Sequence, residues 1–519
     1  MSNITIWILL PTIIAILLFY TIRIHRLQYE QQTSINTIID SLNRRDVDGH
    51  KPLAWIYGEN VCKFKCCIII CINMQVGYLH HVIDIFQKIG FRIWTRREPP
   101  PIEEYGDWHV LWSHEYPFTS SFNLPQLKPF QKVNHFPGSG FITNKVNLAT
   151  SGLKHIPKAF TLPGEKESFI NFTKENPDKL WVQKDNNHRG IRVLSIDQLD
   201  LNRKGTFVQE FIQNPLLIDG KKFDIGLYVT MTSLNPLRIY IYDNEALLRF
   251  CARPYTTNND NSFNASDIDS YVVGDHYTPI WEIPSLDHYY TDLNMNMKSS
   301  LNAYIRLKLD RDPQPIWTSM EESIKTIFYM KEEEMLRLAN VYPNMRNFFE
   351  LVRFDFTIDD QLNVFLMEAN MSPNLASAKY PPNRIIYEQV IYSCLSLVGI
   401  TRMPLTFGTW PNKPEQLWNP YVHHKDLSIL PDICSDEQCD RKNLTSCQHE
   451  QCDVCYHCIT AEMHTILMDA YMEEMSRYHN NRLIPSTSKE SPLTMLGPNT
   501  YLQDKWFIGK CLSNDRWCN

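Results

Sequence analysis

Glycine is scarce in this chain, an excess of basic residues is missing, and no segment repeats at a fixed period. The sequence of 519 residues holds only 18 Gly, which excludes collagen-like and low-complexity structures. Lys and Arg number 51 against 58 Asp and Glu, so a general polycationic nucleic-acid binder is excluded. The lack of repeats excludes a solenoid. Because 43% of the residues are hydrophobic, we expect a packed globular body of about two to four domains.

The first feature present is a long apolar run at the N-terminus. Residues 4–22 carry no charge, and a helix of that length crosses roughly the 30 Å of a hydrocarbon core. A cleaved signal peptide is the alternative, but no basic residue precedes the run and Arg23 follows it. The sequence therefore predicts a single-pass membrane protein, with a transmembrane anchor over residues 1–26 and a polar stalk over 27–50.

The orientation of this anchor has two interpretations. Basic residues follow the apolar run and none precede it, which favours a cytosolic catalytic part. Glycosylation sequons and an even number of tail cysteines leave a lumenal orientation open, because disulfides form in oxidising compartments. The sequons begin at Asn171, Asn264 and Asn443.

The cysteines number 14 and fall mainly in two clusters. One cluster lies in an apolar segment, residues 61–72, which is either a buried strand or an insertion. The other lies in the tail between Cys434 and Cys518 and is large enough for four disulfides. Tetrahedral zinc, held by the cysteines of residues 452–458 and neighbouring histidines, is an alternative there. Unliganded thiols are the third interpretation.

Hydrophobic periodicity indicates a mixed α/β (α+β) fold. Apolar residues at helical spacing predict helices near residues 79–89 and 320–327. Apolar or alternating runs predict strands at residues 91–94, 109–112, 180–184, 207–212, 223–233, 237–242, 246–250, 354–358 and 364–367. After the stalk we expect three regions: an N-terminal α/β lobe over residues 51–130, a catalytic domain over 131–400 and a Cys-rich tail over 401–519.

Carboxylate and amide side chains gather on the last predicted strand pair. Asp355 lies on one strand, and Glu368 and Asn370 lie two residues apart at the end of the next, so they share a face. Oxygen ligands without Cys or His suit Mg²⁺ rather than zinc. Polar residues on an exposed hairpin are the alternative. The apolar neighbours favour burial instead, where a bare carboxylate needs a partner.

Basic side chains form two further groups. Lys184 ends a predicted strand, and Arg189 and Gly190 lie in the loop after it, where a cationic loop can contact phosphate oxygens. The second group consists of Lys222, Asp224 and Arg249. The alternative for the first group, taken alone, is a solvated loop, and the alternative for the second is a surface charge run.

In their order along the chain, these pieces resemble the tubulin–tyrosine ligase-like family, and the membrane-anchored form is similar to an anchored subgroup of worm polyglutamylase-like proteins. No single motif is specific to this family, but the set of motifs in this order is. The motifs are Asn134-His135-Phe136-Pro137, Trp181-Val182-Gln183-Lys184, Arg189-Gly190-Ile191, Gln209-Glu210-Phe211-Ile212, Lys221-Lys222-Phe223-Asp224, and Phe349-Glu350-Leu351 through Asp355 to Glu368-Ala369-Asn370-Met371-Ser372-Pro373.

The resemblance implies an ATP-grasp-like ligase that uses ATP and Mg²⁺ to add glutamate to side-chain carboxylates of tubulin tails (polyglutamylation). A γ-carboxylate would take the γ-phosphate of ATP to form an acylphosphate, and free glutamate would then displace phosphate. The implied partners are tubulin tails, free glutamate and a membrane, with no nucleic acid, and we expect a monomer.

The resemblance also implies a role for each candidate residue. It assigns Mg²⁺ to Asp355, Glu368 and Asn370, phosphates to Lys145, Lys184, Arg189 and Gly190, the adenine hinge to Gln209, Glu210, Phe211 and Ile212, further nucleotide contacts to Lys222 and Asp224, and the transferring phosphate or substrate to Arg249.

Two departures from the family pattern leave other functions open. Gly226 stands where active members carry an Arg that helps to hold the incoming amino acid, and Arg353 stands where they carry Gly. The tail beyond Cys434 is acidic, so acidic tubulin tails should repel it. One alternative is therefore a nucleotide-binding pseudoenzyme or membrane-tethered scaffold. Another is ligase-like or kinase-like chemistry on a lumenal protein.

Overall fold

The structure is a computed structural model in which residues Leu53–Asn519 form one compact unit. Within this unit, the expected boundaries near residues 130 and 400 remain predictions. The residues that the structure describes are 51–58, 61–65, 68–72, 76–96, 98–119, 124–185, 192–194, 196–255, 266–406, 422–442, 445–485 and 498–518.

The predicted single-pass membrane location is corrected. Within the described ranges, no helix is both long enough and apolar enough to cross a bilayer. The apolar run at residues 4–22 and the stalk at residues 27–50 lie outside the described residues.

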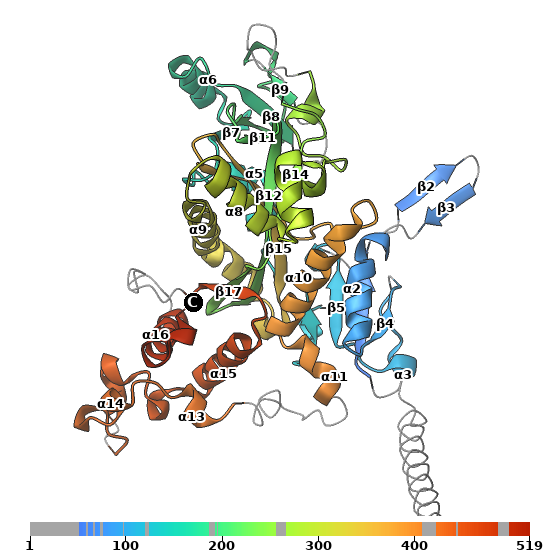
Figure 1. The fold of residues 1–519 in the computed structure, drawn as a ribbon. Helices are drawn as coiled ribbons and strands as arrows, with labels where there is room; N and C mark the ends of the chain where they lie inside the picture. Colours follow the sequence, from blue (N-terminus) through green and yellow to red (C-terminus); the bar gives the residue numbers. More distant parts are fainter. Residues whose placement is uncertain are drawn as a thin grey trace, which may run out of the picture. The chain divides into compact units, whose positions relative to one another are not determined.

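A four-stranded parallel sheet opens the described chain, in the order β4-β1-β5-β6. Figure 1 labels β4 and β5 of this sheet beside α2. β1 (Leu53–Tyr57) pairs with β4 (Arg92–Trp94) and β5 (Val110–Ser113), and β6 (Lys132–Val133) extends the sheet beyond β5. The helix α2 (Val76–Lys88) makes the crossover that two parallel strands require. It buries apolar side chains that recur at helical spacing: Leu79, Val82, Ile85 and Phe86.

A two-stranded antiparallel sheet is inserted between β1 and α2. It consists of β2 (Val61–Lys65) and β3 (Ile68–Ile72), which pair only with each other among the described strands. Of the two interpretations of residues 61–72, the structure therefore has the insertion.

The second four-stranded sheet has the order β7-β10-β8-β9 and is antiparallel. A small aromatic core stabilises it, in which Trp181 and Phe169 are fully buried and meet edge to face with ring centroids 4.8 Å apart. Phe169 comes from α6 (Lys166–Glu175), which packs on β7. The strands are β7 (Ala159–Leu162), β8 (Trp181–Asp185), β9 (Arg192–Leu194) and β10 (Thr206–Glu210).

The central seven-stranded sheet carries the predicted hairpin. Its main order is β16-β15-β12-β13-β17, and β11 and β14 pair with the first half of β12. Every residue of β15 is buried, including the charged residues Glu350, Arg353 and Asp355. The strands are β11 (Leu217–Ile218), β12 (Lys221–Leu234), β13 (Leu237–Tyr242), β14 (Leu247–Phe250), β15 (Glu350–Ile358), β16 (Val364–Asn370) and β17 (Asn480–Ile484).

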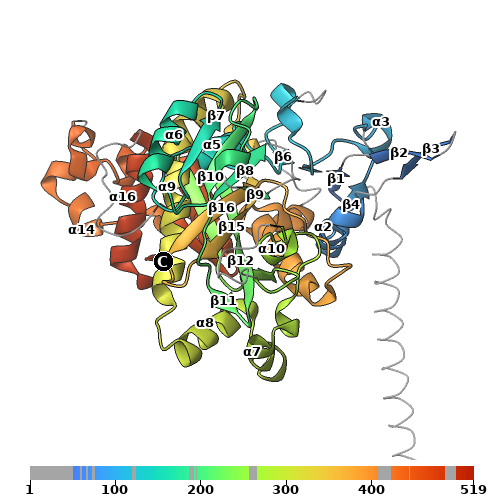
Figure 2. The ribbon, with the colours of Figure 1, turned by 90° about the horizontal axis from the view of Figure 1, so that it is seen from above.

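Helices cover this sheet. The long helix α9 (Gln314–Ala339) packs beside β16, as Figure 2 shows. It also packs against α4 (Gly140–Thr143), and α10 (Arg384–Leu397) packs against α2. The other α-helices of the described part are α3 (Ile102–Tyr105), α5 (Lys145–Ala149), α7 (Pro284–Asp287), α8 (Met297–Lys308), α11 (Met403–Thr406), α13 (His424–Leu427), α14 (Pro431–Cys434), α15 (Ala461–Ser476) and α16 (Pro498–Ser513).

The Cys-rich tail contributes to the central sheet. Its strand β17 pairs with β13, which the sequence pattern did not indicate. All eight tail cysteines are paired, so the structure has disulfides there rather than zinc ligands or free thiols. The bridges are Cys434–Cys455, Cys439–Cys452, Cys447–Cys458 and Cys511–Cys518.

A buried ion pair joins the tail to the sheet. Arg238 on β13 donates from Nε to Glu473 Oε2 at 2.8 Å and from its terminal nitrogen to Oε1 at 2.9 Å. The Thr232 hydroxyl also donates to Glu473, and Gln503 on α16 accepts from Arg238. Arg238 is only 3% exposed and Glu473 only 6%, so the pair is desolvated and depends on these contacts.

We predict that Glu473→Gln destabilises the chain. The substitution leaves the Arg238 charge buried without its counter-ion, which costs about 3–5 kcal/mol. Thermal unfolding monitored by circular dichroism measures the change. Glu333→Gln, at a side chain that is 85% exposed on α9, is the control and should leave the Tm unchanged. Equal Tm values for the two variants would contradict the role of the pair.

Candidate functional site

The predicted site residues lie across four adjacent strands of the central sheet. On β12, Asp224 is opposite Arg249 of β14, and Gly226 is opposite Asp355 of β15. Asp355 in turn is opposite Glu368 of β16. Residues between 13 (Asp355 and Glu368) and 144 (Asp224 and Glu368) positions apart in sequence are therefore brought into one row by strand register.

The three predicted oxygen ligands contact each other. Asn370 donates its amide nitrogen to Asp355 Oδ2 at 3.0 Å and to Glu368 Oε1 at 3.2 Å. Glu368 and Asn370 share one face of β16, as their spacing predicts, and a register shift after Asp355 separates this pairing from the rest of the hairpin. Sequence reasoning thus placed the cluster correctly, while its role as a metal site stays a prediction.

Asp355 is held by two guanidinium groups. Arg353 donates from Nε to Oδ1 at 2.7 Å and from its terminal nitrogen to Oδ2 at 2.8 Å. Arg249 lies 3.1 Å from Oδ2. Because Asp355 is 1% exposed and Arg353 6%, the forked contact compensates the charge that burial would otherwise leave bare.

Gly226 makes room for this contact. A Cβ at position 226 would lie 3.0 Å from the Arg353 Cδ and 3.1 Å from Asp355 Oδ1. Gly226 and Arg353 are therefore coupled by packing, because the Arg353 side chain lies in the space that a side chain at position 226 would need. The sequence showed Arg353 only as a departure, although its i, i+2 spacing from Asp355 was a signal that both side chains share a face.

Further cations surround the carboxylates. Lys145 on α5 lies 3.3 Å from Glu368 Oε2, and Lys222 lies 3.1 Å from Asp224 Oδ1. The Nε of Arg249 is buried and has no hydrogen-bond partner among the described residues. A buried donor without a partner is costly, so this nitrogen is available to an anionic ligand.

The ionisation of Glu368 follows from these neighbours. Burial raises the pKa of the Glu368 carboxyl, but Lys145 and the hydrogen bond from Asn370 outweigh burial and hold the pKa at about 2. Glu368 is therefore a carboxylate at any ordinary pH, which a cation ligand has to be.

Lys184 connects the second sheet to the same charges. It extends from β8 and donates to Gln209 Oε1 on β10 at 2.9 Å. Burial lowers the pKa of the Lys184 amine, Glu368 raises it and Lys145 lowers it, to a value of about 8. Lys184 is thus mostly charged at neutral pH and loses its charge within the mildly alkaline range.

The other predicted residues are distributed as follows. Glu210 ends β10 and pairs with Lys179 at 2.7 Å, and the Phe211 amide donates to the Leu180 carbonyl, so this stretch lies beside β8. Ile212 follows, half-buried. The predicted phosphate contacts Arg189 and Gly190 lie outside the described residues.

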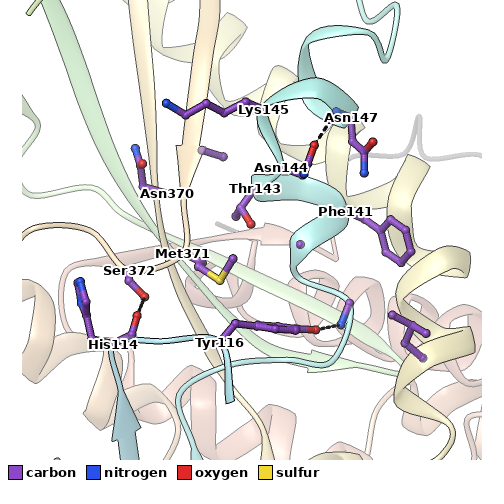
Figure 3. Close-up of a pocket in the computed structure, with 14 residues that line it drawn as sticks. His114, Tyr116, Phe141, Thr143, Asn144, Lys145, Asn147, Asn370, Met371 and Ser372 are labelled. Atoms are coloured by element: carbon purple, nitrogen blue, oxygen red, sulfur yellow. Dashed lines mark hydrogen bonds between the residues drawn. The ribbon is translucent and has the colours of Figure 1, made fainter. Parts of the chain in front are cut away.

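A cavity of about 650 Å³ opens next to these side chains. Figure 3 shows Lys145 reaching from its helix toward the strand that carries Asn370, with Met371 and Ser372 below. Sequence reasoning missed the residues His114 and Tyr116 on the far wall, because they come from the loop after β5. Two hydrogen bonds fix that wall: Ser372 to the His114 carbonyl at 2.6 Å, and the Gly138 amide to the Tyr116 hydroxyl at 2.7 Å.

Part of the motif set supports the site rather than forming it. Glu350 accepts from the His135 ring at 2.7 Å and from the Phe136 amide at 3.0 Å. All of these groups are buried. The contact ties the start of β15 to the segment that leads to α5, which positions Lys145 above Glu368.

The structure is thus a mixed α/β protein in which carboxylates, an amide and several cations lie together at one row of the central sheet. The profile of the tubulin-tyrosine ligase family matches residues 123–406. The chain therefore belongs to the tubulin-tyrosine ligase family.

Curated relatives agree with this membership. The probable tubulin polyglutamylase ttll-15 of Caenorhabditis elegans is 41% identical over 455 residues, covering 86% of this chain and 85% of that protein. The human tubulin polyglutamylase TTLL5 is 33% identical over 375 residues, covering 66% of this chain. This chain spans only 28% of the human protein's length.

We predict that Gly226→Ala disturbs the site. The added Cβ has to displace Arg353 or Asp355 by a few tenths of an ångström, and overpacking of this kind costs about 1–3 kcal/mol. Thermal unfolding measures the loss. The control is Gly274→Ala, since a Cβ there meets no described atom within 4 Å. If both variants unfold at the same temperature as the parent chain, Gly226 is not needed for the Arg353 contact.

Proposed function

We propose that this chain is an ATP- and Mg²⁺-dependent ligase with an ATP-grasp-like site that adds glutamate to side-chain carboxylates of tubulin tails. One observation carries the proposal: Asp355, Glu368 and Asn370 meet at the end of a hairpin, directly beside a set of cations. The names of the relatives supply the reaction. The 41% identical protein is called a probable tubulin polyglutamylase, and the human relative a tubulin polyglutamylase.

The residues fit a hard divalent cation. The donors are all oxygens, and the carboxylate of Glu368 is ionised at any ordinary pH. Asn370 now directs its amide nitrogen toward both carboxylates. It would offer Mg²⁺ its oxygen after the amide turns over, and Glu368 would be the main charged ligand. A bound Mg²⁺ would neutralise phosphate charge.

The cations fit the polyphosphate. Lys145, Lys222 and Arg249 now pair with the three carboxylates of the row, in contacts between 3.1 and 3.3 Å. Each can turn to a phosphate oxygen without leaving its place on the sheet or helix. The unpartnered Nε of Arg249 supports its assignment to the phosphoryl group that is transferred.

The proposed reaction proceeds in two displacements. The γ-carboxylate of an acceptor glutamate attacks the γ-phosphorus of ATP, which releases ADP and leaves an acylphosphate. The amine of free glutamate then attacks the acyl carbon, loses a proton and expels inorganic phosphate, which leaves an isopeptide bond. Arg249 and Lys145 would stabilise charge on the phosphoryl oxygens, while Lys184 and Gln209 would hold the nucleotide from the second sheet.

A second function, nucleotide binding without ligation, is favoured by one observation. Arg353 occupies both oxygens of Asp355, which reduces what Asp355 can offer a cation. In that case the chain would bind nucleotide through its lysines and serve as a binding protein. The following experiment separates the two functions.

We expect purified chain incubated with ATP, Mg²⁺, glutamate and tubulin to add glutamyl units to tubulin tails, detected by mass spectrometry. Glu368→Gln removes the main charged ligand and should lower the rate by about a hundredfold or more. It should also weaken Mg²⁺-dependent ATP binding, measured by calorimetry. Glu333→Gln on the exposed face of α9 is the control for both readouts.

Three outcomes separate the hypotheses. Nucleotide binding without mass increments under any condition favours the binding protein. Absence of both defeats both functions. An unchanged nucleotide affinity in Glu368→Gln removes the metal role of that residue.

The charge on Lys184 predicts a pH dependence. Because its pKa is about 8, the amine is protonated below that pH and increasingly neutral above it. ATP affinity should therefore be constant from about pH 6.5 to pH 7.5 and fall toward about pH 9.5, since each unit above the pKa removes up to about nine-tenths of the remaining charge. Lys184→Arg keeps the charge throughout and should flatten the profile. An alkaline fall that is the same in both proteins would assign it to another group.

A further inference from the structure

The packing of α2 on α10 brings three metal-ligating side chains together, and none of them belongs to the strands of the ligase site. His81 and Asp84 are three residues apart on α2 and thus lie on one face of the helix. Glu388 comes from α10. A nitrogen of His81 and one oxygen from each carboxylate all lie within 4.8 Å of one another.

His81 has a free nitrogen directed at the carboxylates. The residue is only 2% exposed, and its Nδ1 has no hydrogen-bond partner among the described residues. This nitrogen lies 3.5 Å from Glu388 Oε1, too far for a good hydrogen bond. A buried ring nitrogen without a partner costs free energy, and a ligand between the three side chains would remove that cost.

The other nitrogen of the ring is fixed. His81 Nε2 lies 2.7 Å from the Ser377 hydroxyl, which is itself buried. Metal-ligating histidines usually have such a partner on the second nitrogen, because it sets the ring orientation. The Ser377 contact therefore holds the imidazole with Nδ1 facing Glu388.

We propose that His81, Asp84 and Glu388 form a site for a divalent transition-metal cation of the zinc type, with water completing the coordination. One imidazole nitrogen and two carboxylate oxygens are a borderline donor set, which suits Zn²⁺ better than Mg²⁺ or Ca²⁺. Among the described residues, the other set with ligand atoms this close is Cys447, His457 and Cys458. In that set both sulfurs are used in a disulfide.

Two cationic side chains that now pair with Glu388 would have to move away when the metal ion binds. Lys88 lies 2.8 Å from Oε2, and Arg384 lies 2.7 Å from Oε1. Their side chains are 51% and 58% exposed, respectively, so either can turn into water at little cost. Glu388 is only 18% exposed and stays in place.

The metal would join two parts of the described fold. α2 covers the parallel sheet, whereas α10 follows the loop that leaves β16 and its residues Glu368 and Asn370. A cation bound by both helices would stabilise their packing. Since it binds only the folded chain, it would raise the unfolding temperature with increasing concentration.

The test uses the full chain, first treated with EDTA and dialysed. Calorimetric titration with zinc chloride should show one site per chain, and thermal unfolding should shift upward by about 2 °C or more at a hundredfold excess over the Kd. Asp84→Asn should bind zinc at least about tenfold more weakly and lose the shift. Glu388→Gln should do the same, provided that both variants unfold near the parent Tm in EDTA.

The matched control is His464→Gln. His464 and His424 place ring nitrogens 3.2 Å apart on the surface and are the obvious competing zinc site. A shift that persists in Asp84→Asn, or that disappears in His464→Gln, would overturn the proposal, as would no binding by the parent chain. The ligase assay distinguishes the two proposals, because Asp84→Asn should retain glutamyl transfer in magnesium buffer whether or not zinc binds.

Discussion

The row of charges across β12, β14, β15 and β16 is the constraint on which the remaining site depends. Asp355 lies in a strand with no exposed residue, and an ionised carboxylate in such a place must be compensated. The compensation comes from Arg353 on its own strand and from Arg249 two strands away. Those contacts fix the arginines, and Glu368 similarly engages Lys145 across from α5. Electrostatic pairing thus prearranges the cations that a phosphate ligand would use.

A small residue on β12 lies beside a large residue on the neighbouring strand β15, which explains how the buried arginine and aspartate fit between the strands. A guanidinium stem on β15 needs free volume on β12, and Gly226 provides it. Considered singly, Gly226 suggests a lost function and Arg353 suggests an obstructed metal site. Considered together, they fit each other: Arg353 lies in the space that position 226 leaves free and donates to both oxygens of Asp355.

Much of this site was predictable because period-two alternation is a local signal. The spacing of Glu368 and Asn370 placed them on one face. Their apolar neighbours indicated burial, which the structure has for Asp355, whereas Glu368 and Asn370 are half-buried. What could not be predicted depends on contacts between distant segments. The Arg353–Asp355 fork requires knowing the χ angles, the wall of the cavity at Tyr116 comes from a loop with no pattern, and the pairing of β17 with β13 is a register choice without a sequence signal. The disulfide pairing also could not be deduced, because eight cysteines allow many connectivities.

The position of β17 along the chain has a consequence for biosynthesis. β13 is buried along its whole length, and β17, which pairs with its edge, is made from residues Asn480–Ile484. A ribosome must therefore translate more than nine-tenths of the 519 codons before the sheet that carries the candidate site can close. Until then the nascent polypeptide has an open strand edge, which is prone to mispairing, and the cysteines that precede β17 have already been synthesised. Closure of the sheet is thus among the last events in making this protein.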